Sequence, residues 1–235
     1  MPAESAAAIP DEIRNKLVLV LDADDLVPAL RLSRELRPWF GVAKVGLELF
    51  SAAGPDAIGS LVEQGYDVFM DLKLLDIPTT VGKAARVLGA VGARYLTLHA
   101  RGDAVMLRAG VEGLREGASR AGLPEPYPLA VTVLTSDADA PPHILPARVA
   151  LAAETECAGI VCAAADLAEA RQIAPGLLRV VPGIRPKGSP VHDQARAATP
   201  REALDQGADL LVIGRAVTEA DHPAAAAEAL VAELV

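Results

Sequence analysis

Cysteine is almost absent from this sequence, which contains only Cys157 and Cys162. Neither their number nor their spacing suggests a disulfide framework or a zinc site, so both are expected to be core or helix-face thiols. His143, His192 and His222 fall in expected loops or helix starts, and no pair of histidines has the spacing of metal ligands. The sequence therefore predicts no metal site.

Positive charge is also scarce. The chain has 22 Lys and Arg residues against 31 Asp and Glu, which gives a net charge of −9 and a pI near 5.0. No Lys/Arg cluster is dense enough for the basic face of a nucleic-acid-binding protein, so no nucleic-acid partner is expected. The acidity favours a small-molecule ligand. An anionic ligand would need the few basic residues to be concentrated at its site.

Long apolar runs are missing, although 51% of the residues are hydrophobic. No run reaches the roughly 18 residues that a membrane-spanning helix needs. The segment from Met1 to Lys16 lacks the charged and then apolar stretches of a secretory signal peptide. We therefore expect a cytoplasmic protein with no membrane partner and with a large hydrophobic core.

Short β-branched runs alternate along the chain with longer stretches that can be helical, such as Val27–Arg37 and Pro78–Val91. Proline suits the first turn of a helix, where its missing N–H has no partner to lose. The expected strands are Leu17–Asp22, Val42–Gly46, Asp67–Lys73, Tyr95–His99, Leu129–Leu134, Gly159–Cys162, Leu178–Pro182 and Leu210–Gly214.

Eight βα repeats in a chain of 235 residues favour an α/β fold of the closed (β/α)8 TIM-barrel type. The alternative, a doubly wound open sheet, is disfavoured because no GxGxxG motif follows the first strand. No linker or break in composition divides the chain, so residues 1–235 are expected to form a single domain. In such barrels catalytic residues lie at the carboxyl ends of the strands.

The third expected strand ends in charged residues. Successive side chains of a strand alternate between its two faces, so Asp71 and Lys73 point the same way. Met70, Leu72 and Leu74 point the other way and are expected to pack on helices. The charged face then points into the barrel mouth. His99, at the end of the fourth strand, is expected to be a satisfied strand-end histidine rather than a ligand.

Lys44, Asp71, Lys73 and Asp76 together form a balanced set of two cations and two anions. Buried charges are costly unless they are paired. One interpretation is a structural ion-pair network that closes the top of the barrel. The other is an array that holds a reacting group in a fixed electrostatic field.

The end of the last strand has the features of a phosphate site. Gly214 allows close backbone approach, and Arg215 supplies donors that match phosphate oxygens at the start of a helix. The preceding loop, Pro182 to Asp193, contains Arg185 and is followed by Gln194. Its composition suits a mobile lid over an anion, with an ordinary solvated loop as the alternative.

The stretch Asp71-x-Lys73-x-x-Asp76-Ile77-Pro78-x-Thr80-Val81 resembles the signature of orotidine 5′-phosphate decarboxylases. The resemblance extends from the first strand to the eighth. The further matching stretches, in that family's order, are Leu21-Asp22, Lys44-Val45-Gly46-x-Glu48-Leu49-Phe50, Val131-Thr132-Val133-Leu134-Thr135-Ser136, Val181-Pro182-Gly183-Ile184-Arg185-Pro186, Asp193-Gln194 and Val212-Ile213-Gly214-Arg215.

The resemblance implies conversion of orotidine 5′-phosphate to uridine 5′-phosphate without a cofactor. It implies Lys73 as the proton donor to C6 and Asp71 beside the departing carboxylate, with Lys44 and Asp76 completing the catalytic set. It also implies a homodimer with shared active sites, in which Asp76 and Thr80 come from the partner subunit.

The same resemblance implies which residues bind the rest of the substrate. Asp22 and Lys44 would bind the ribose hydroxyls, and Thr135, or less favourably Ser136, would lie near the pyrimidine. The phosphate would be held by Arg185, Gln194, Gly214 and Arg215.

The sequence departs from the family pattern in two places. Leu74-Leu75 stands where many bacterial members have Phe-His, and Ala100-Arg101-Gly102-Asp103 follows His99 in place of a small residue and a glycine pair.

Two rival interpretations of the function remain. One is a Mg²⁺-dependent sugar-phosphate decarboxylase or hexulose-phosphate synthase of the same suprafamily, and the other is a non-catalytic phosphate-binding barrel. Ile77-Pro78 and the pair Arg185 and Gln194 favour the nucleotide enzyme over the first rival, and intact Asp71 and Lys73 disfavour the second.

Overall fold

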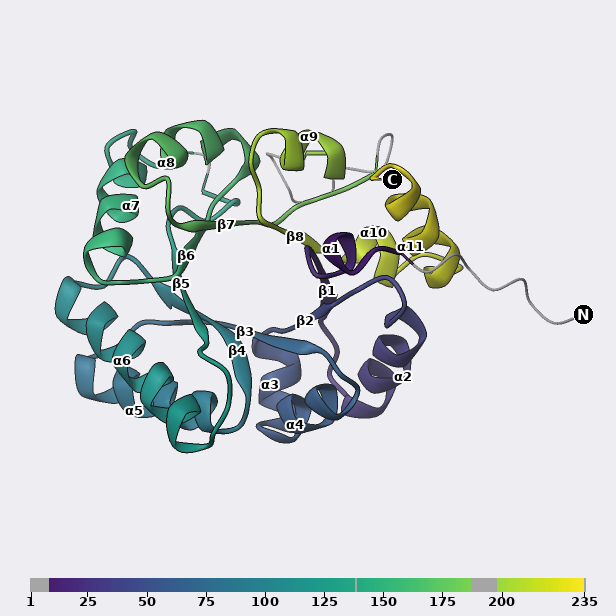
Figure 1. Cartoon of the computed structure of the whole chain (residues 1–235), viewed down its shortest axis with the longest axis horizontal. Helices are drawn as coiled ribbons and strands as arrows, with labels where there is room; N and C mark the ends of the chain where they lie inside the picture. Colours follow the sequence, from purple (N-terminus) through teal and green to yellow (C-terminus); the bar gives the residue numbers. More distant parts are fainter. Residues whose placement is uncertain (1–8, 138, 187–197, 235) are drawn as a thin grey trace, which may run out of the picture.

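The expected strands close into a barrel. In a computed structural model that describes residues 9–137, 139–186 and 198–234, each strand pairs in parallel with the next and β1 pairs with β8 (Figure 1). The strands are β1 (Leu17–Leu21), β2 (Val42–Val45), β3 (Asp67–Leu74), β4 (Ala93–His99), β5 (Tyr127–Val131), β6 (Gly159–Val161), β7 (Leu178–Val181) and β8 (Leu210–Ile213). The predicted TIM barrel is confirmed.

Helices surround the barrel (Figure 1). They are α1 (Asp11–Arg14), α2 (Leu26–Leu36), α3 (Leu47–Ala53), α4 (Asp56–Glu63), α5 (Pro78–Ala90), α6 (Ala104–Arg120), α7 (Ile144–Glu154), the 3₁₀ turn η1 (Ala164–Asp166), α8 (Leu167–Ile173), α9 (Pro200–Asp205), α10 (Arg215–Thr218) and α11 (Pro223–Ala232). The start of α2 is fixed by Asp25, whose carboxylate accepts the N–H of Val27 at 2.8 Å. Pro78 occupies the first turn of α5 as expected.

Two apolar clusters result from the alternation of side chains along the strands. The larger cluster fills the space between the strands and the helices, and it contains the buried thiols of Cys157 and Cys162, as predicted. The smaller cluster fills the inside of the barrel, and we call it the inner cluster. Its members are Val18, Val42, Phe69, Tyr95, Leu129, Val180, Leu210 and Val212.

Aromatic rings pack against one another in and around the inner cluster. The ring of Tyr95 stacks on that of Tyr127, with centroids 5.0 Å apart, and lies 5.9 Å from that of Phe69. The guanidinium of Arg94 lies 4.5 Å from the centroid of Tyr127. The barrel interior below the site is therefore a packed core.

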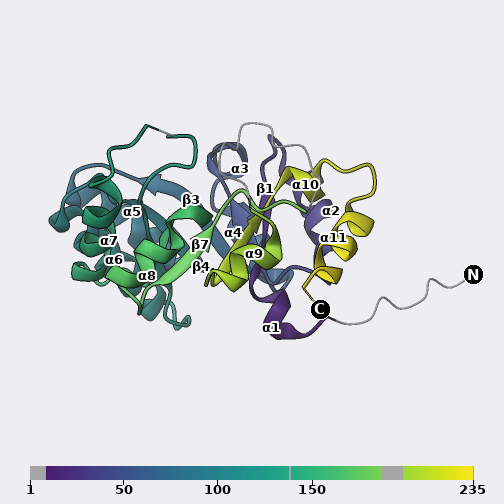
Figure 2. The ribbon, with the colours of Figure 1, turned by 90° about the horizontal axis from the view of Figure 1, so that it is seen from above.

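The two ends of the barrel differ. Helix α1 lies at the end where the strands begin (Figure 2), next to the start of β1. The candidate site opens at the opposite end, where the strands finish. None of the helices in the described part of the chain is both long and apolar enough to cross a membrane.

Helices α5 and α6 pack backbone against backbone through glycines. A Cβ atom on Gly113 would lie 2.2 Å from the carbonyl oxygen of Gly82, and one on Gly117 would lie 2.0 Å from that of Arg86. Both distances are too short for any larger residue without separation of the helices. Because α5 begins at Pro78, this contact also fixes the segment that follows β3.

Candidate functional site

Polar side chains follow the inner cluster at the carboxyl ends of the strands. A cavity of about 780 Å³ opens there. Two positions beyond Val42 and Phe69, on the same strand faces, stand Lys44 and Asp71, and both line the cavity. On both strands, the inward-facing side chains therefore change from apolar to charged over two residues.

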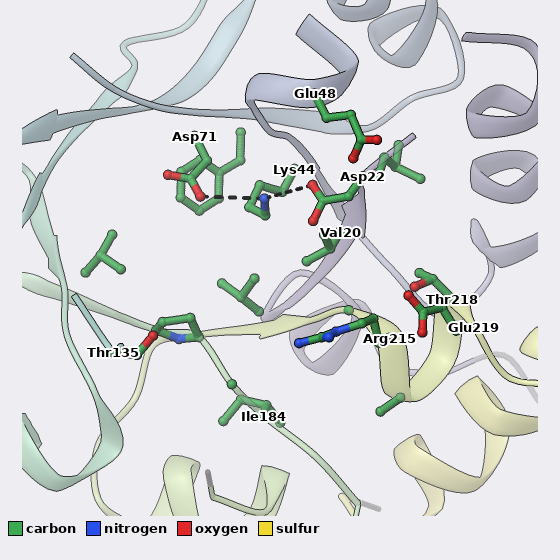
Figure 3. A pocket seen from close by; sticks show the side chains of 18 of the residues that line it. Val20, Asp22, Lys44, Glu48, Asp71, Thr135, Ile184, Arg215, Thr218 and Glu219 are labelled. Atoms are coloured by element: carbon green, nitrogen blue, oxygen red, sulfur yellow. Dashed lines mark ion pairs between the residues drawn. The ribbon is translucent and has the colours of Figure 1, made fainter. Parts of the chain in front are cut away.

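Four charged side chains form a continuous row along one wall of this cavity. Lys44 Nζ lies 3.5 Å from Asp22 Oδ1 and 3.5 Å from Asp71 Oδ2, so it stands between the two carboxylates (Figure 3). Lys73 Nζ lies 2.9 Å from Asp71 Oδ1. The Lys44 side chain is 10% exposed and that of Asp71 is 18% exposed. We call Asp22, Lys44, Asp71 and Lys73 the ion row.

The ion row keeps Asp71 ionised. Burial by itself raises the pKa of this carboxyl group, but the positive charges of Lys44 and Lys73 lower it. Hydrogen bonds from Lys73 and Thr97 lower it further, and the net result is a pKa below the usual value for aspartate. A carboxylate therefore remains fixed between two ammonium groups at neutral pH.

The row also depends on a glycine. A Cβ atom at position 46 would lie 2.9 Å from Asp22 Oδ1 and 3.3 Å from Lys44 Nζ. Gly46 therefore leaves the space in which Asp22 and Lys44 meet.

Lys73 reaches Asp71 through an irregular backbone. The expectation that the two side chains share a face is confirmed, but the strand is not regular there. Lys73 has a φ of +49°, and the pairing of β3 with β4 shifts between Met70 and Leu74. A non-glycine residue in this region signals local strain, which is common at functional sites.

The other side of the cavity carries the residues expected to bind phosphate and pyrimidine. Arg215 and Thr135 line it across from the ion row (Figure 3). Gly214 and Arg185 also line the cavity, and Arg185 is only 8% exposed. Gln194, the remaining expected phosphate ligand, lies outside the described residues.

Asp76 and Thr80 do not line this cavity. Both are exposed, and Asp76 Oδ1 accepts the N–H of Ile77 at 2.6 Å. Within one chain, the paired charges therefore differ from the set expected from the sequence. Lys44 pairs with Asp22 rather than with Asp76.

Sequence reasoning gave no role to two acidic residues that line the cavity, Glu48 and Glu219. Figure 3 shows Glu48 near Asp22, and Glu219 near Arg215. Glu48 stands in a stretch that matched the family pattern, which could have marked it. No sequence signal pointed to Glu219.

His99 is half-buried at the end of β4, and its Nδ1 accepts the N–H of Arg101 at 3.2 Å. Burial lowers its pKa, and the positive charges of Arg148, Arg101 and Lys73 lower it further. This fits the expected satisfied strand-end histidine. In the described part of the chain, no three His, Cys, Asp or Glu side chains are grouped so as to hold a metal ion.

Comparison with known proteins gives one consistent result. Residues 15–230 match the model of the orotidine 5′-phosphate decarboxylase / HUMPS family. The chain is 45% identical to the orotidine 5′-phosphate decarboxylase of Anaeromyxobacter dehalogenans, over 93% of this chain and 98% of that protein. It is 42% identical to the decarboxylase of Moorella thermoacetica, over 94% and 92% of the two chains. The crystal structure of the Lactobacillus acidophilus decarboxylase matches with a TM-score of 0.79 and 33% identity, over 93% of this chain and 98% of that one.

Proposed function

Because the chain belongs to the orotidine 5′-phosphate decarboxylase / HUMPS family, we propose that it converts orotidine 5′-phosphate to uridine 5′-phosphate in de novo pyrimidine biosynthesis, with Lys73 as the proton donor to C6. The observation that carries the proposal is the ion row, which places Lys73 against Asp71 at 2.9 Å in a cavity large enough for a nucleotide. Arg215 on the opposite wall supplies a cation for the phosphate.

The arrangement of the cavity supports one orientation of the substrate. Its phosphate binds Arg185 and Arg215 with the backbone of Gly214, together with Gln194. The ribose hydroxyls bind Asp22 and Lys44, which are already paired. Thr135 then lies by the pyrimidine, and C6 reaches Asp71 and Lys73.

The reaction breaks the bond between C6 and the carboxylate and leaves the electron pair on C6. Carbon dioxide departs, and a proton from Lys73 Nζ forms the new C–H bond. Until that proton is transferred, an ammonium already fixed beside C6 stabilises the developing carbanion, and preorganised charges of this kind usually make the largest single contribution to catalysis. Two like charges about 4 Å apart repel by about 4 kcal/mol at an effective dielectric constant of 20, which would act between Asp71 and the substrate carboxylate. The proposal rests on Lys73 and not on that repulsion.

We further propose that the active sites are shared across a homodimer, with Asp76 and Thr80 entering the partner's cavity. Two observations support this. Asp76 and Thr80 are exposed and do not line the cavity of their own chain. They are flanked by apolar side chains that are also exposed, Leu75 at 46% and Ile77 at 66%. The cytoplasmic location stays a prediction from the sequence.

An absorbance assay for the loss of orotidine 5′-phosphate, with and without EDTA, tests the proposed function. We expect turnover that chelation leaves unchanged, because Lys44 already stands between the two carboxylates, Asp22 and Asp71, that a divalent cation would use. Turnover of a sugar phosphate with strict dependence on Mg²⁺ would instead identify the hexulose-phosphate branch, which the family description also covers. Tight binding of the nucleotide with no turnover would indicate a binding barrel.

A further inference from the structure

A threonine lies buried beneath the two charged residues of β3. Thr97 is 0% exposed and stands on β4, two positions beyond Tyr95 of the inner cluster. The large apolar members of the inner cluster fill the barrel below it. A hydroxyl group in such a position costs free energy unless it is hydrogen-bonded.

The strand pairing gives Thr97 an unusual position. Met70 pairs with Leu96, and the next pair is Leu74 with Leu98. Three residues of β3, Asp71 to Lys73, therefore face the single residue Thr97 of β4. This is a bulge in β3, and bulges interrupt the regular backbone ladder and redirect side chains.

At this bulge, the hydroxyl of Thr97 takes the place of a backbone hydrogen-bond partner on β4. Its Oγ1 accepts the backbone N–H of Lys73 at 2.8 Å. The same oxygen lies 3.1 Å from Asp71 Oδ1 and 3.4 Å from the carbonyl oxygen of Met70. A hydroxyl has one proton to donate, and the carboxylate is both closer and charged, so it is the stronger acceptor.

We propose that Thr97 is a positioning residue for the decarboxylation, because its one hydroxyl group fixes both the backbone of Lys73 and the carboxylate of Asp71. The inference rests on the proposed function and extends it from the charged groups to the residue beneath them. Thr97 holds Lys73 in its left-handed conformation, with φ at +49°, and sets the rotation of the Asp71 carboxylate between Lys44 and Lys73. Thr97 acts through these residues and not on the substrate.

The test compares Thr97→Val and Thr97→Ser with the wild-type protein in the orotidine 5′-phosphate assay. Valine keeps the shape and burial but removes the hydroxyl, whereas serine keeps the hydroxyl. We expect Thr97→Val to lower kcat by about 10- to 100-fold, as small misplacements of reacting groups do. KM should change less than about threefold, because Arg215, the proposed phosphate ligand, lies on the opposite wall. Thr97→Ser should recover most of kcat.

Thr155→Val is the matched control. Thr155 is also buried, at 1% exposure, and its hydroxyl bonds to the carbonyl oxygen of Leu151 at 2.8 Å, away from the ion row. Its loss should lower the melting temperature without changing kcat. A kcat loss shared equally by Thr97→Val and Thr155→Val would show a general effect of removing a buried hydroxyl and would overturn the inference.

Three further results would also overturn it. These are a Thr97→Val variant with wild-type kcat, a loss confined to KM, and a Thr97→Ser variant no better than Thr97→Val. If Thr97→Val does not fold, Thr97→Ala removes the same hydroxyl without the added methyl group, and the same comparison of kcat with KM decides. A wild-type chain that does not consume orotidine 5′-phosphate overturns the proposed function and this inference together, whereas an active wild type with an indifferent Thr97→Val variant overturns only the inference.

Discussion

Lys44 Nζ lies 3.5 Å from Asp71 Oδ2 across the neighbouring strands β2 and β3, and both side chains are mostly buried. Their pairing should therefore contribute to the stability of the barrel as well as to the proposed chemistry. We expect Asp71→Asn to destabilise the fold by roughly 1–3 kcal/mol at pH 7, because Lys44 and Lys73 lose the anion between them. Asp22 still faces Lys44 and Lys73 is 36% exposed, which keeps the cost below that of a fully buried pair.

The same pair predicts a pH dependence. The folded protein holds the pKa of Asp71 below its usual value, so its contribution to stability is complete above the unfolded pKa of about 4. It is lost as the pH falls through the folded pKa. Urea denaturation at a series of pH values should therefore show the wild type losing its advantage over Asp71→Asn below about pH 4. An advantage that grows on acidification would contradict this.

Arg215→Ala should weaken binding of the phosphorylated substrate. A hydrogen bond to a charged group contributes about 1.5–3 kcal/mol, so KM for orotidine 5′-phosphate should rise about 10- to 100-fold. The activity on orotidine, which has no phosphate, should change far less. Steady-state kinetics on both substrates make the comparison, and equal losses would show that Arg215 does not contact the phosphate.

The glycine contact between α5 and α6 should tolerate no side chain. Gly117→Ala brings a Cβ atom to 2.0 Å from the carbonyl oxygen of Arg86, so we expect a loss of about 1–3 kcal/mol. Gly59→Ala is the control, because Gly59 lies in α4 with open space around it. It should leave stability unchanged or raise it by up to about 1 kcal/mol. Thermal melting of the two variants would separate packing from helix propensity.

The sequence predicts the strands that carry this site better than the local backbone geometry within it. The strands could be located because parallel strands covered by helices are almost continuous apolar runs, although the expected Leu129–Leu134 is Tyr127–Val131 in the structure. The alternation rule correctly placed Asp71 and Lys73 together, but it assumed a regular strand. The bulge depends on how β3 pairs with β4, and pairing between strands leaves no mark in the sequence of either one.

Thr97 was not singled out from the sequence for the same reason, since its role depends on how β3 pairs with β4. Thr97 is a β-branched residue within an apolar strand, where threonine is common for its β propensity alone. Only the position of its hydroxyl opposite the bulge distinguishes it. Asp76 illustrates the reverse case: it is close in sequence to Asp71 and Lys73, but within one chain its carboxylate accepts the N–H of Ile77 and is not part of the ion row.

Asp76 also gives a prediction about assembly. If each active site takes Asp76 from the partner subunit, Lys73→Ala and Asp76→Ala homodimers should both be nearly inactive. After subunit exchange, a mixed dimer has one site with both residues intact, so activity should return. Recovery of up to about a quarter of the wild-type level is expected, since half of the dimers are mixed and each has one complete site. No recovery after confirmed exchange would place Asp76 in the site of its own chain.

Lys73→Ala alone tests the chemical step. We expect turnover to fall by about three orders of magnitude or more, because the variant lacks the proposed proton donor and the cation beside C6. The fold should persist, since Lys73 is 36% exposed and its removal opens no large apolar cavity. Alanine also takes the backbone strain at φ +49° no worse than lysine, because both are L residues with a Cβ atom.

Turnover, melting temperature and ligand affinity should be measured on one preparation of this variant. Binding should survive, because Arg215 and Asp22, the proposed ligands of the phosphate and the ribose, are unchanged. The loss should therefore fall on kcat and not on KM, as for a group that acts in the transition state. A folded variant with near-normal turnover would remove Lys73 from the chemistry. If Lys73→Ala does not fold, Lys73→Met keeps most of the packing of the aliphatic stem and removes the charge and the proton, so it poses the same question of the reaction.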